Sequence, residues 1–279
     1  MILTIDIGGT NIKYGLCDDM GCFLQKGDYA TPQTTQDIVE SICSLPFDYS
    51  GIAISMPGIM NEDHSKAYIT GKLSFLSDYP LKEDIMRIKN CKVTLENDGR
   101  CATWAELGFG NLMDSKNALV VVLGTYIGMG IVINHKVYEG SHLLAGEYSD
   151  AHMDTEKTYK NTMAAYFGKD GLERATGLTG RELFDCLDDE KVYASFNKYC
   201  QNLAWMLNNL QLLLDVDTIL IGGGISAQPK LIDCIKENMI GLKQWFSTLE
   251  MPIVRACKFN NDANLLGALY YYKNNTENH

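Results

Sequence analysis

The chain alternates short apolar runs with amphipathic segments, and glycine-rich turns separate them. Residues 2–7 are rich in β-branched side chains and stop at Gly8-Gly9, which predicts a buried strand followed by a turn. Ile38, Val39 and Ile42 share one face at helical spacing, which predicts a helix over 35–44. Strands interleaved with helices in this way are typical of an α/β fold with a partly parallel sheet.

The same patterns predict elements along the whole chain. Strands are expected at 2–7, 11–17, 22–29, 52–56, 92–95, 118–123, 127–133, 137–138, 218–221 and 252–256. Helices are expected at 35–44, 80–88, 100–107, 230–238 and 264–272. Residues 155–215 are predicted to be mainly helical, with 192–214 as the longest stretch.

Two distant segments share one plan. Residues 3–10 and 119–125 each form an apolar run that ends in a Gly-Thr turn and leads into a second strand. Their separation of about 115 residues is the length of one domain. We expect a first domain of residues 1–108, with the helix at 262–279 packing back on it, and a second domain of residues 109–261. A hinge is expected near residues 108–111.

Composition narrows the class of protein. The chain has 24 Lys and Arg against 35 Asp and Glu, a net charge of −11, which argues against nucleic-acid binding. No apolar run approaches the ~18 residues of a membrane helix, and the first residues lack the pattern of a signal peptide. Nine scattered cysteines without a C-x-x-C pair predict reduced thiols in a cytoplasmic protein.

The first candidate for chemistry is the turn at residues 6–13. Gly8 and Gly9 let the backbone approach a phosphate, and Thr10 and Asn11 add donors. Asp6, at the strand end, could hold Mg²⁺ or its water shell. A plain β-hairpin is the alternative. The segment is neither a Walker A loop nor a G-x-G-x-x-G fingerprint, so a dinucleotide site is disfavoured.

The second candidate is Glu96-Asn97-Asp98-Gly99, at the end of a predicted strand. Open α/β sheets bind ligands at the carboxyl ends of their strands. Asp98 could therefore accept the proton of an attacking hydroxyl, and Asn97 could bind a polyol. The alternative is an N-cap for the following helix.

Three further turns are weaker candidates. Residues 124–130 could form a second phosphate turn, and residues 221–226 place three glycines after a strand. Glu147, in Ala145-Gly146-Glu147, could accept hydrogen bonds from two sugar hydroxyls. An exposed loop carboxylate and a flexible turn are the simpler interpretations.

The order of these motifs is more specific than any one of them. Asp-Ile-Gly-Gly-Thr, Met-Pro-Gly, Glu-Asn-Asp, Gly-Thr, Ala-Gly-Glu and Ile-Gly-Gly-Gly begin at residues 6, 56, 96, 124, 145 and 221. This series resembles the ROK family (repressors, open reading frames and sugar kinases) of the actin–hexokinase fold. Residues 261–268 also resemble the closing helix of that family, so the resemblance spans nearly the whole chain.

The resemblance implies two ribonuclease-H-like α/β domains flanking a cleft, and ATP- and Mg²⁺-dependent phosphorylation of a hexose. By position, Asp98 matches the catalytic base, and Asn97 and Glu147 match ligands of sugar hydroxyls. Residues 68–73 resemble a sugar-side loop, which adds Gly71 and Lys72, and His152 is a further candidate. The implied phosphate and nucleotide contacts are Asp6, Gly8, Gly9, Thr10, Asn11, Lys13, Gly124, Thr125, Gly223 and Gly224. Family members are typically homodimers.

The chain also departs from the family pattern. Residues 148–185 contain no cysteine, so we expect no structural zinc. Asp150 stands where the family usually has His, and His152 follows two residues later. Tyr126 and Met129 replace usual glycines and could narrow the second phosphate turn. Arg100 places a cation near the catalytic end, where it could depress the pKa of Asp98 or touch a phosphate.

Two other functions remain open at this point. A catalytically weak sugar- or nucleotide-binding protein on the same fold would explain the bulk at Tyr126 and Met129. An α/β oxidoreductase is a remote alternative. The sequence does not identify the sugar or the hydroxyl, nor does it show whether Cys101 is reactive.

Overall fold

The computed structural model describes residues 1–156, 158–239 and 250–276. By its internal contacts the chain divides into two compact units. Unit 1 comprises Met1–Met113, Glu139–Ala145 and Asn261–His279, and unit 2 comprises Asp114–Tyr138 and Gly146–Asn260. Unit 1 therefore includes residues 109–113, which the sequence boundary had placed in the second domain. It also includes residues 139–145, a segment that no sequence signal had separated from its neighbours.

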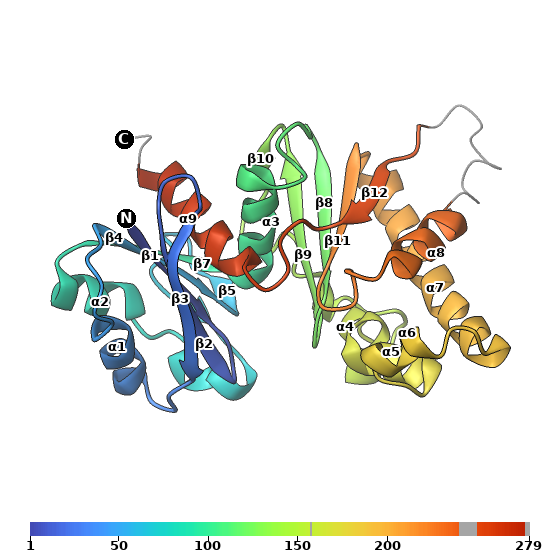
Figure 1. Ribbon diagram of the computed structural model, residues 1–279, viewed down its shortest axis with the longest axis horizontal. Helices are drawn as coiled ribbons and strands as arrows, with labels where there is room; N and C mark the ends of the chain where they lie inside the picture. Colours follow the sequence, from blue (N-terminus) through green and yellow to red (C-terminus); the bar gives the residue numbers. More distant parts are fainter. Residues whose placement is uncertain (157, 240–249, 277–279) are drawn as a thin grey trace. The chain divides into compact units, whose positions relative to one another are not determined.

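Unit 1 contains a five-stranded mixed sheet in the order β3-β2-β1-β4-β7 (Figure 1). Its strands are β1 Ile2–Ile7, β2 Asn11–Cys17, β3 Phe23–Ala30, β4 Gly51–Met56 and β7 Lys92–Asn97. The strands β1, β4 and β7 run parallel, and β1-β2-β3 form antiparallel pairs. A small hairpin of β5 Ile59–Met60 and β6 Ala67–Tyr68 follows β4.

The central strands β1 and β4 of this sheet are buried on both faces, and each face packs on different helices. Leu3, Ile5 and Ile7 of β1 share a core with α1 Thr35–Cys43 and α2 Leu81–Lys89. On the other face, Ile2 and Ala53 pack with Cys101 of α3 Asp98–Phe109 and with α9 Ala263–Thr276. Because successive strand residues point to opposite faces, the even-numbered Asp6 points toward the α9 side.

Unit 2 repeats the strand order of unit 1. Its sheet runs β10-β9-β8-β11-β12, which has the same neighbour relations and the same mixture of parallel and antiparallel pairs. The strands are β8 Ala118–Leu123, β9 Ile127–Ile133, β10 Lys136–Val137, β11 Thr218–Gly222 and β12 Ile253–Ala256. β1 and β8 occupy the same place in the two sheets, as the repeated sequence plan predicted.

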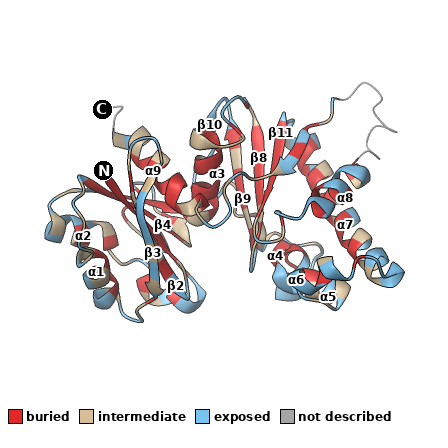
Figure 2. Cartoon of the chain, in the orientation of Figure 1, coloured by how far each residue is buried: buried red, intermediate tan, exposed pale blue. Residues whose placement is uncertain are grey.

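Outside residues 157 and 240–249, the helices of unit 2 are α4 Met163–Phe167, α5 Lys169–Thr176, α6 Gly180–Asp185, α7 Glu190–Leu214 and α8 Pro229–Met239. One core joins Leu119 and Val121 of β8 to side chains of α4, α7 and α8. In Figure 2 the buried residues concentrate on the strands of each sheet and on the helix faces toward them. The fold is the expected mixed α/β arrangement.

The expected elements differ from the observed ones mainly at their ends. β7 continues to Asn97 and α3 begins at Asp98, so the motif Glu96-Asn97-Asp98 lies at the strand–helix junction itself. The helical region 155–215 is interrupted by turns, and it contains α4 to α7 together with the 3₁₀ turn Tyr159–Asn161. Further 3₁₀ turns lie at Gly71–Leu76 and Tyr148–Asp150. Among the described helices, none is long and apolar enough to span a lipid bilayer.

Candidate active-site residues of the two units

Polar side chains line the carboxyl ends of the parallel strands of unit 1. The strand register places Asp6 of β1 beside Ser55 of β4, and Ser55 beside Glu96 of β7. Asn97 is the next residue along β7 and pairs with Met56. Ligands of open α/β sheets bind at this end of the strands. The structure therefore brings the first and second sequence candidates to one edge of one sheet.

Asp6 is buried and held by neighbours from two directions. Asn264 of α9 donates a hydrogen bond from Nδ2 to Asp6 Oδ1 at 3.1 Å, and Lys13 Nζ lies 4.0 Å from Oδ2. Burial raises the pKa of Asp6, while the bond from Asn264 and the charge of Lys13 oppose that rise. Asn264 was not a sequence candidate, because only the packing of α9 reveals its contact with Asp6.

The turn after β1 is tight, as expected of a phosphate turn. Gly8 N donates to Asn11 O at 3.1 Å, and a side chain at Gly8 would place its Cβ only 2.8 Å from that oxygen. Gly9 and Thr10 are exposed at the tip. Asn11 instead donates its amide to Asp28 of β3 at 2.8 Å, so this amide is engaged within the sheet.

Lys72 lies beside this turn. A Cβ built at Gly9 would stand 3.6 Å from Cβ of Lys72, the second residue of the 3₁₀ turn Gly71–Leu76. Gly71 has φ +76° and open space around its Cα. The proposed sugar-side residues Gly71 and Lys72 therefore adjoin the first phosphate turn.

Asn97 caps helix α3. Its Oδ1 accepts a hydrogen bond from Arg100 N at 3.1 Å, and its Nδ2 donates to Gly58 O at 2.9 Å. The cap interpretation is therefore correct for Asn97, and it leaves one amide N–H for any ligand.

Asp98 follows at the first position of α3 and is partly buried. Its Oδ1 accepts a hydrogen bond from Gly99 N at 2.8 Å. Burial and then the charge of Asp6 raise its pKa to about 6, against the smaller effect of Arg100. The expectation that Arg100 would depress the pKa of Asp98 is wrong in net direction, because burial and Asp6 outweigh it.

Arg100 is 1% exposed, which contradicts a role as an open phosphate ligand. Its Nε donates to Glu96 Oε1 at 2.8 Å, and its Nη1 donates to Leu143 O at 3.1 Å. The motif Glu-Asn-Asp-Gly-Arg places Glu96 and Arg100 four residues apart, so the strand–helix junction brings their side chains together. This spacing was the available signal for a buried ion pair.

His64 and Glu139 complete a charged cluster around this pair. His64 Nε2 lies 3.7 Å from Glu139 Oε2, and Nδ1 lies 4.0 Å from Glu96 Oε1. Burial alone would lower the pKa of His64, but Glu139 and Glu96 raise it overall. His64, Glu96 and Glu139 could each offer a metal ligand within 4.8 Å of one another. Arg100 already supplies a cation to Glu96, so a charge network is the better interpretation.

The two glycine turns of unit 2, residues 124–130 and 221–226, contain no Asp or Glu. Gly124 N donates to Tyr126 O at 3.0 Å, and Gly124 O accepts from Lys169 N at 2.9 Å. Gly223 has φ +93°, and a Cβ there would lie 2.1 Å from Leu123 O. Only glycine fits that position. By contrast, a Cβ at Gly224 would meet nothing within 4 Å.

Met129 and Tyr126, which stand where the family usually has glycine, differ in how far they are buried. Met129 is 4% exposed and belongs to the core of unit 2, whereas Tyr126 is 58% exposed. Tyr126 contacts Tyr159 edge to face, with ring centroids 6.5 Å apart. The Met129 side chain therefore packs in the core, and the Tyr126 side chain lies at the surface.

Glu147 is partly buried and directly precedes the 3₁₀ turn Tyr148–Asp150. A side chain at Gly146 would stand 2.5 Å from Met129 O, so the chain passes close to β9 just before Glu147. His152 is exposed and forms an isolated β-bridge with Thr162. Thr125 is exposed as well.

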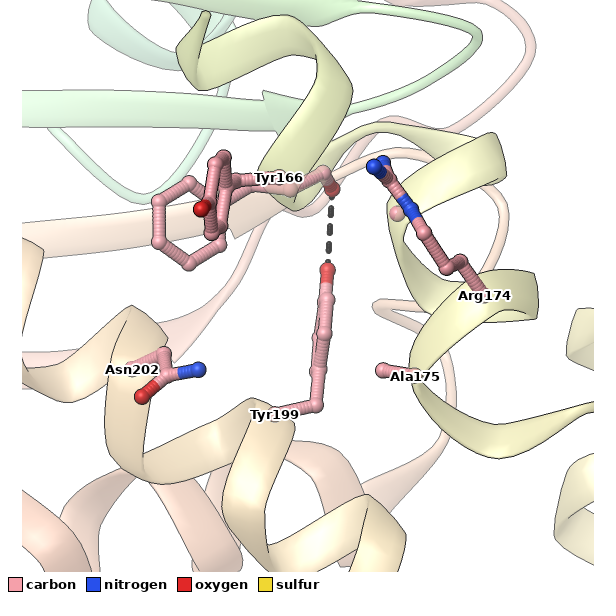
Figure 3. A pocket seen from close by; sticks show the side chains of 7 residues that line it. Tyr166, Arg174, Ala175, Tyr199 and Asn202 are labelled. Carbon is pink, nitrogen blue, oxygen red and sulfur yellow. Dashed lines mark hydrogen bonds between the residues drawn. The ribbon is translucent and has the colours of Figure 1, made fainter. Parts of the chain in front are cut away.

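A pocket of about 240 Å³ lies between α4, α5 and α7 of unit 2. Arg174 projects from α5, and Tyr199 and Asn202 come from α7 (Figure 3). Tyr199 donates its hydroxyl hydrogen to Phe167 O at 2.9 Å, and Arg174 donates to Ala165 O. These two polar groups therefore serve the fold, and none of the sequence candidates lines the pocket.

Cys101 is fully buried in the first turn of α3, which follows the motif Glu96-Asn97-Asp98. Burial, with a smaller contribution from Glu96, raises its pKa well above the ordinary value. A thiol held in its neutral form in the core is a poor nucleophile, so Cys101 is a packing residue.

Two α/β units of one strand order, with carboxylates at one sheet edge and glycine turns in both, define a protein of the actin–hexokinase class. The chain belongs to the ROK family, whose model matches residues 2–275. It is 28% identical to a beta-glucoside kinase of Listeria innocua over 298 aligned positions, covering 100% of this chain and 99% of that one.

Two further relatives agree with this assignment. The chain is 25% identical to an N-acetylmannosamine kinase of Haemophilus influenzae, covering 97% of this chain and 95% of that one. Its structure resembles that of a ROK family protein from Streptococcus pneumoniae in complex with sucrose. The TM-score is 0.89 at 28% identity, with 100% of this chain and 99% of that chain covered.

Proposed function

We propose that this protein is an ATP-dependent sugar kinase that transfers the γ-phosphate of ATP to a hydroxyl of a hexose. The observation that carries the proposal is Asp98, a carboxylate at the carboxyl edge of the unit 1 sheet whose pKa is raised to about 6. Relatives that align over essentially the whole chain are named sugar kinases. Units 1 and 2 correspond, in this proposal, to the two domains of the family.

Asp98 is the general base. A sugar hydroxyl is a weak nucleophile, so a carboxylate that takes its proton during transfer lowers the barrier. A pKa near 6 makes Asp98 a stronger base than an exposed aspartate while leaving it ionised at neutral pH. The hydrogen bond from Gly99 N orients the carboxylate.

The phosphate side requires donors and a cation, because transfer depends on positioning and on neutralising the phosphoryl oxygens. In this proposal the backbone N–H groups of Gly9, Thr10 and Thr125 face the phosphates. Gly8 and Gly124 shape the two turns, because their own N–H groups donate to Asn11 O and Tyr126 O. Lys13 adds a positive charge, Asn11 lies at the base of the first turn, and Gly223 and Gly224 serve the nucleotide.

Mg²⁺ is the proposed metal ion, and Asp6 is its proposed protein contact. A carboxylate is a suitable ligand for this hard cation. Bound Mg²⁺ would neutralise charge on the phosphates. Asn264, bonded to Asp6 Oδ1, leaves Oδ2 facing Lys13 and the turn side.

The sugar side is assigned to Asn97 and Glu147, with Gly71, Lys72 and His152 as further contacts. The remaining N–H of the Asn97 amide can donate to a hydroxyl. Glu147 can accept two hydroxyl hydrogen bonds, and Lys72 adjoins the first phosphate turn.

Several coarser properties complete the proposal. We propose no structural zinc, because residues 148–185 lack cysteine. We propose a cytoplasmic homodimer that acts on small molecules and not on nucleic acid or membranes. The need for ATP supports the location, the charge of −11 supports the lack of nucleic acid, and exposed Trp205 and Leu213 on α7 suit a subunit contact.

A coupled ADP-release assay with Mg-ATP across a panel of hexoses and glucosides tests this function. Sugar-dependent turnover is expected, and Asp98→Asn should reduce it by about 10²- to 10⁴-fold, the range of general-base catalysis. Calorimetry should show that Asp98→Asn still binds the sugar. Binding of sugar without turnover by the unaltered protein would contradict the kinase and favour a binding protein.

A further inference from the structure

We propose that Arg100 is a positioning residue that anchors the loop 139–145 to the catalytic motif and so sets how the sugar is bound. This inference rests on the proposed kinase function. The loop belongs to unit 1 although the chain on both sides of it belongs to unit 2. It leads directly into Ala145-Gly146-Glu147, the segment with the proposed sugar ligand.

Arg100 joins the two segments by its side chain. Nε donates to Glu96 Oε1 at 2.8 Å, and Nη1 donates to Leu143 O at 3.1 Å. The same Glu96 Oε1 accepts Asn97 N at 2.7 Å, and Trp104 Nε1 donates to Oε2 at 3.4 Å. Three donors therefore fix the Glu96 carboxylate. The Arg100 guanidinium bonds both to this carboxylate and to Leu143 O, so it fixes the loop relative to Glu96.

The loop backbone has an unusual conformation at Leu143, the residue that Arg100 contacts. Leu143 is buried among the apolar residues of unit 1 and has φ +58°, a left-handed conformation that is unfavourable for a leucine. Such a conformation persists only where the surroundings enforce it. The burial of the Leu143 side chain and the bond from Arg100 to its carbonyl oxygen enforce it here.

The start of the loop has its own anchor in the same cluster. Glu139 Oε2 lies 3.7 Å from His64 Nε2, while His64 Nδ1 lies 2.9 Å from the Tyr271 hydroxyl and 3.3 Å from Leu95 O. His64 thus connects the loop to β7 and α9. Three residues lie between the two anchors, so residues 139–143 are fixed at both ends.

Arginine suits this role because its planar guanidinium group can donate to two acceptors at once, here Glu96 Oε1 and Leu143 O. Lysine at position 100 would keep the positive charge near Glu96, but its single ammonium group cannot reproduce both bonds in the same plane. Arg100→Lys therefore tests the anchor while retaining the charge that keeps Glu96 from being buried alone.

The matched control is Arg87→Lys in α2 of the same unit. The side chain of Arg87 is 76% exposed and pairs with Asp84 at 2.7 Å on its own helix. Both changes replace an arginine that pairs with a carboxylate. Only the change at position 100 releases a loop.

The first measurement is steady-state kinetics of ADP release. Arg100→Lys is expected to raise the KM for the sugar about tenfold or more, as a displaced positioning group does, and to leave the KM for Mg-ATP within about twofold. A merely structural role would lower the active fraction and hence the apparent kcat without separating the two KM values. Equal KM values in Arg100→Lys and Arg87→Lys would overturn the proposal.

The second measurement is amide hydrogen exchange and does not need turnover. Exchange across residues 139–145 is expected to be about tenfold faster in Arg100→Lys, with β1 unchanged, because local opening reports local stability. Unchanged exchange in that loop would refute the anchor. If the unaltered protein phosphorylates no sugar, the proposed function fails, and hydrogen exchange alone then decides whether Arg100 anchors the loop.

Discussion

The two sheets share a strand order but not the chemistry of their edges. In unit 1 the row at the carboxyl edge is Asp6, Ser55 and Glu96. In unit 2 the equivalent positions of β8 and β11 are Val122 and Gly222, and a Cβ on Gly222 would meet Cys257 Sγ at 3.0 Å. One copy of the architecture carries acids, and the other carries small uncharged residues.

This difference shows how a repeated fold can separate two tasks. Acids at one edge can take a proton and bind a cation, whereas an uncharged edge lets glycine backbone approach an anion without repelling it. A second row of carboxylates in unit 2 would oppose the binding of a polyphosphate. This contrast supports the proposed assignment of the base and the metal ligand to unit 1.

Asp6→Val places in β1 the residue that β8 has at the equivalent position, Val122. Among the changes that compare the two units, it should have the largest effect. We expect kcat to fall by about 100-fold or more, because a preorganised charged group at a transferring phosphate is lost. The fold should remain, since the burial that raises the pKa of Asp6 also makes its charge costly. ADP release beside the exposed control Asp19→Val measures this, and full activity of Asp6→Val would refute the division of tasks.

Gly223→Ala tests the corresponding turn in unit 2. Its Cβ would lie 2.1 Å from Leu123 O at φ +93°, so we expect the free energy of unfolding to fall by about 1–3 kcal/mol. Gly224→Ala, next to it, meets no atom and should change stability little. Denaturant unfolding of both variants gives the comparison, and similar losses in the two would show that Gly223 is not strained.

The pH dependence of turnover should report Asp98. The base must be ionised, so kcat/KM should fall as the pH drops through about 6, the raised pKa of Asp98. Because the charge of Asp6 contributes to that rise, Asp6→Asn should lower the pKa of Asp98, which carboxyl NMR titration can follow in a weakly active variant. An acid limb at the ordinary value of 3.8 would contradict the effect of burial.

The raised pKa of Asp98 also makes the stability of the folded protein depend on pH. The folded protein favours protonated Asp98 over its ionised form, so the contribution of this group to stability is present below pH 3.8. That contribution is lost as the pH rises through about 6. Asp98, the proposed base, therefore lowers the stability of the folded protein at neutral pH.

Tyr126→Gly should have the smallest effect. The side chain is 58% exposed and outside the core, so restoring the usual glycine should change the KM for ATP by less than about threefold. The same assay as above measures it. A gain of tenfold or more would instead show that Tyr126 obstructs the nucleotide.

Local patterns were sufficient for much of the fold. β1, β2, β8 and β9 have the predicted bounds, because their apolar runs are closed by turns with strong residue preferences. The family resemblance placed the catalytic motif, and the structure puts it at the end of β7. The cap by Asn97 was also readable, since Asn is a preferred capping residue.

Contacts between segments that are far apart along the chain could not be predicted from the sequence. Nothing in the sequence indicated that Leu143 O would accept a bond from Arg100, or that Asn264 would hold Asp6. Arg100 next to a catalytic aspartate was interpreted from its charge alone. Its buried side chain donates to Glu96 and to Leu143 O, and Leu143 lies 43 residues further along the chain, so only the folded chain brings these groups together.

Helix α9 has a consequence for how this protein is made. It covers Ile2, Ala53 and Cys101, and Gly267 passes so close to Cys101 O that no larger residue fits. Unit 1 therefore cannot close its second core until α9 leaves the ribosome. At about 5–20 residues per second, the sheet waits roughly ten to thirty seconds with one apolar face uncovered, which makes nascent unit 1 a natural client for a chaperone.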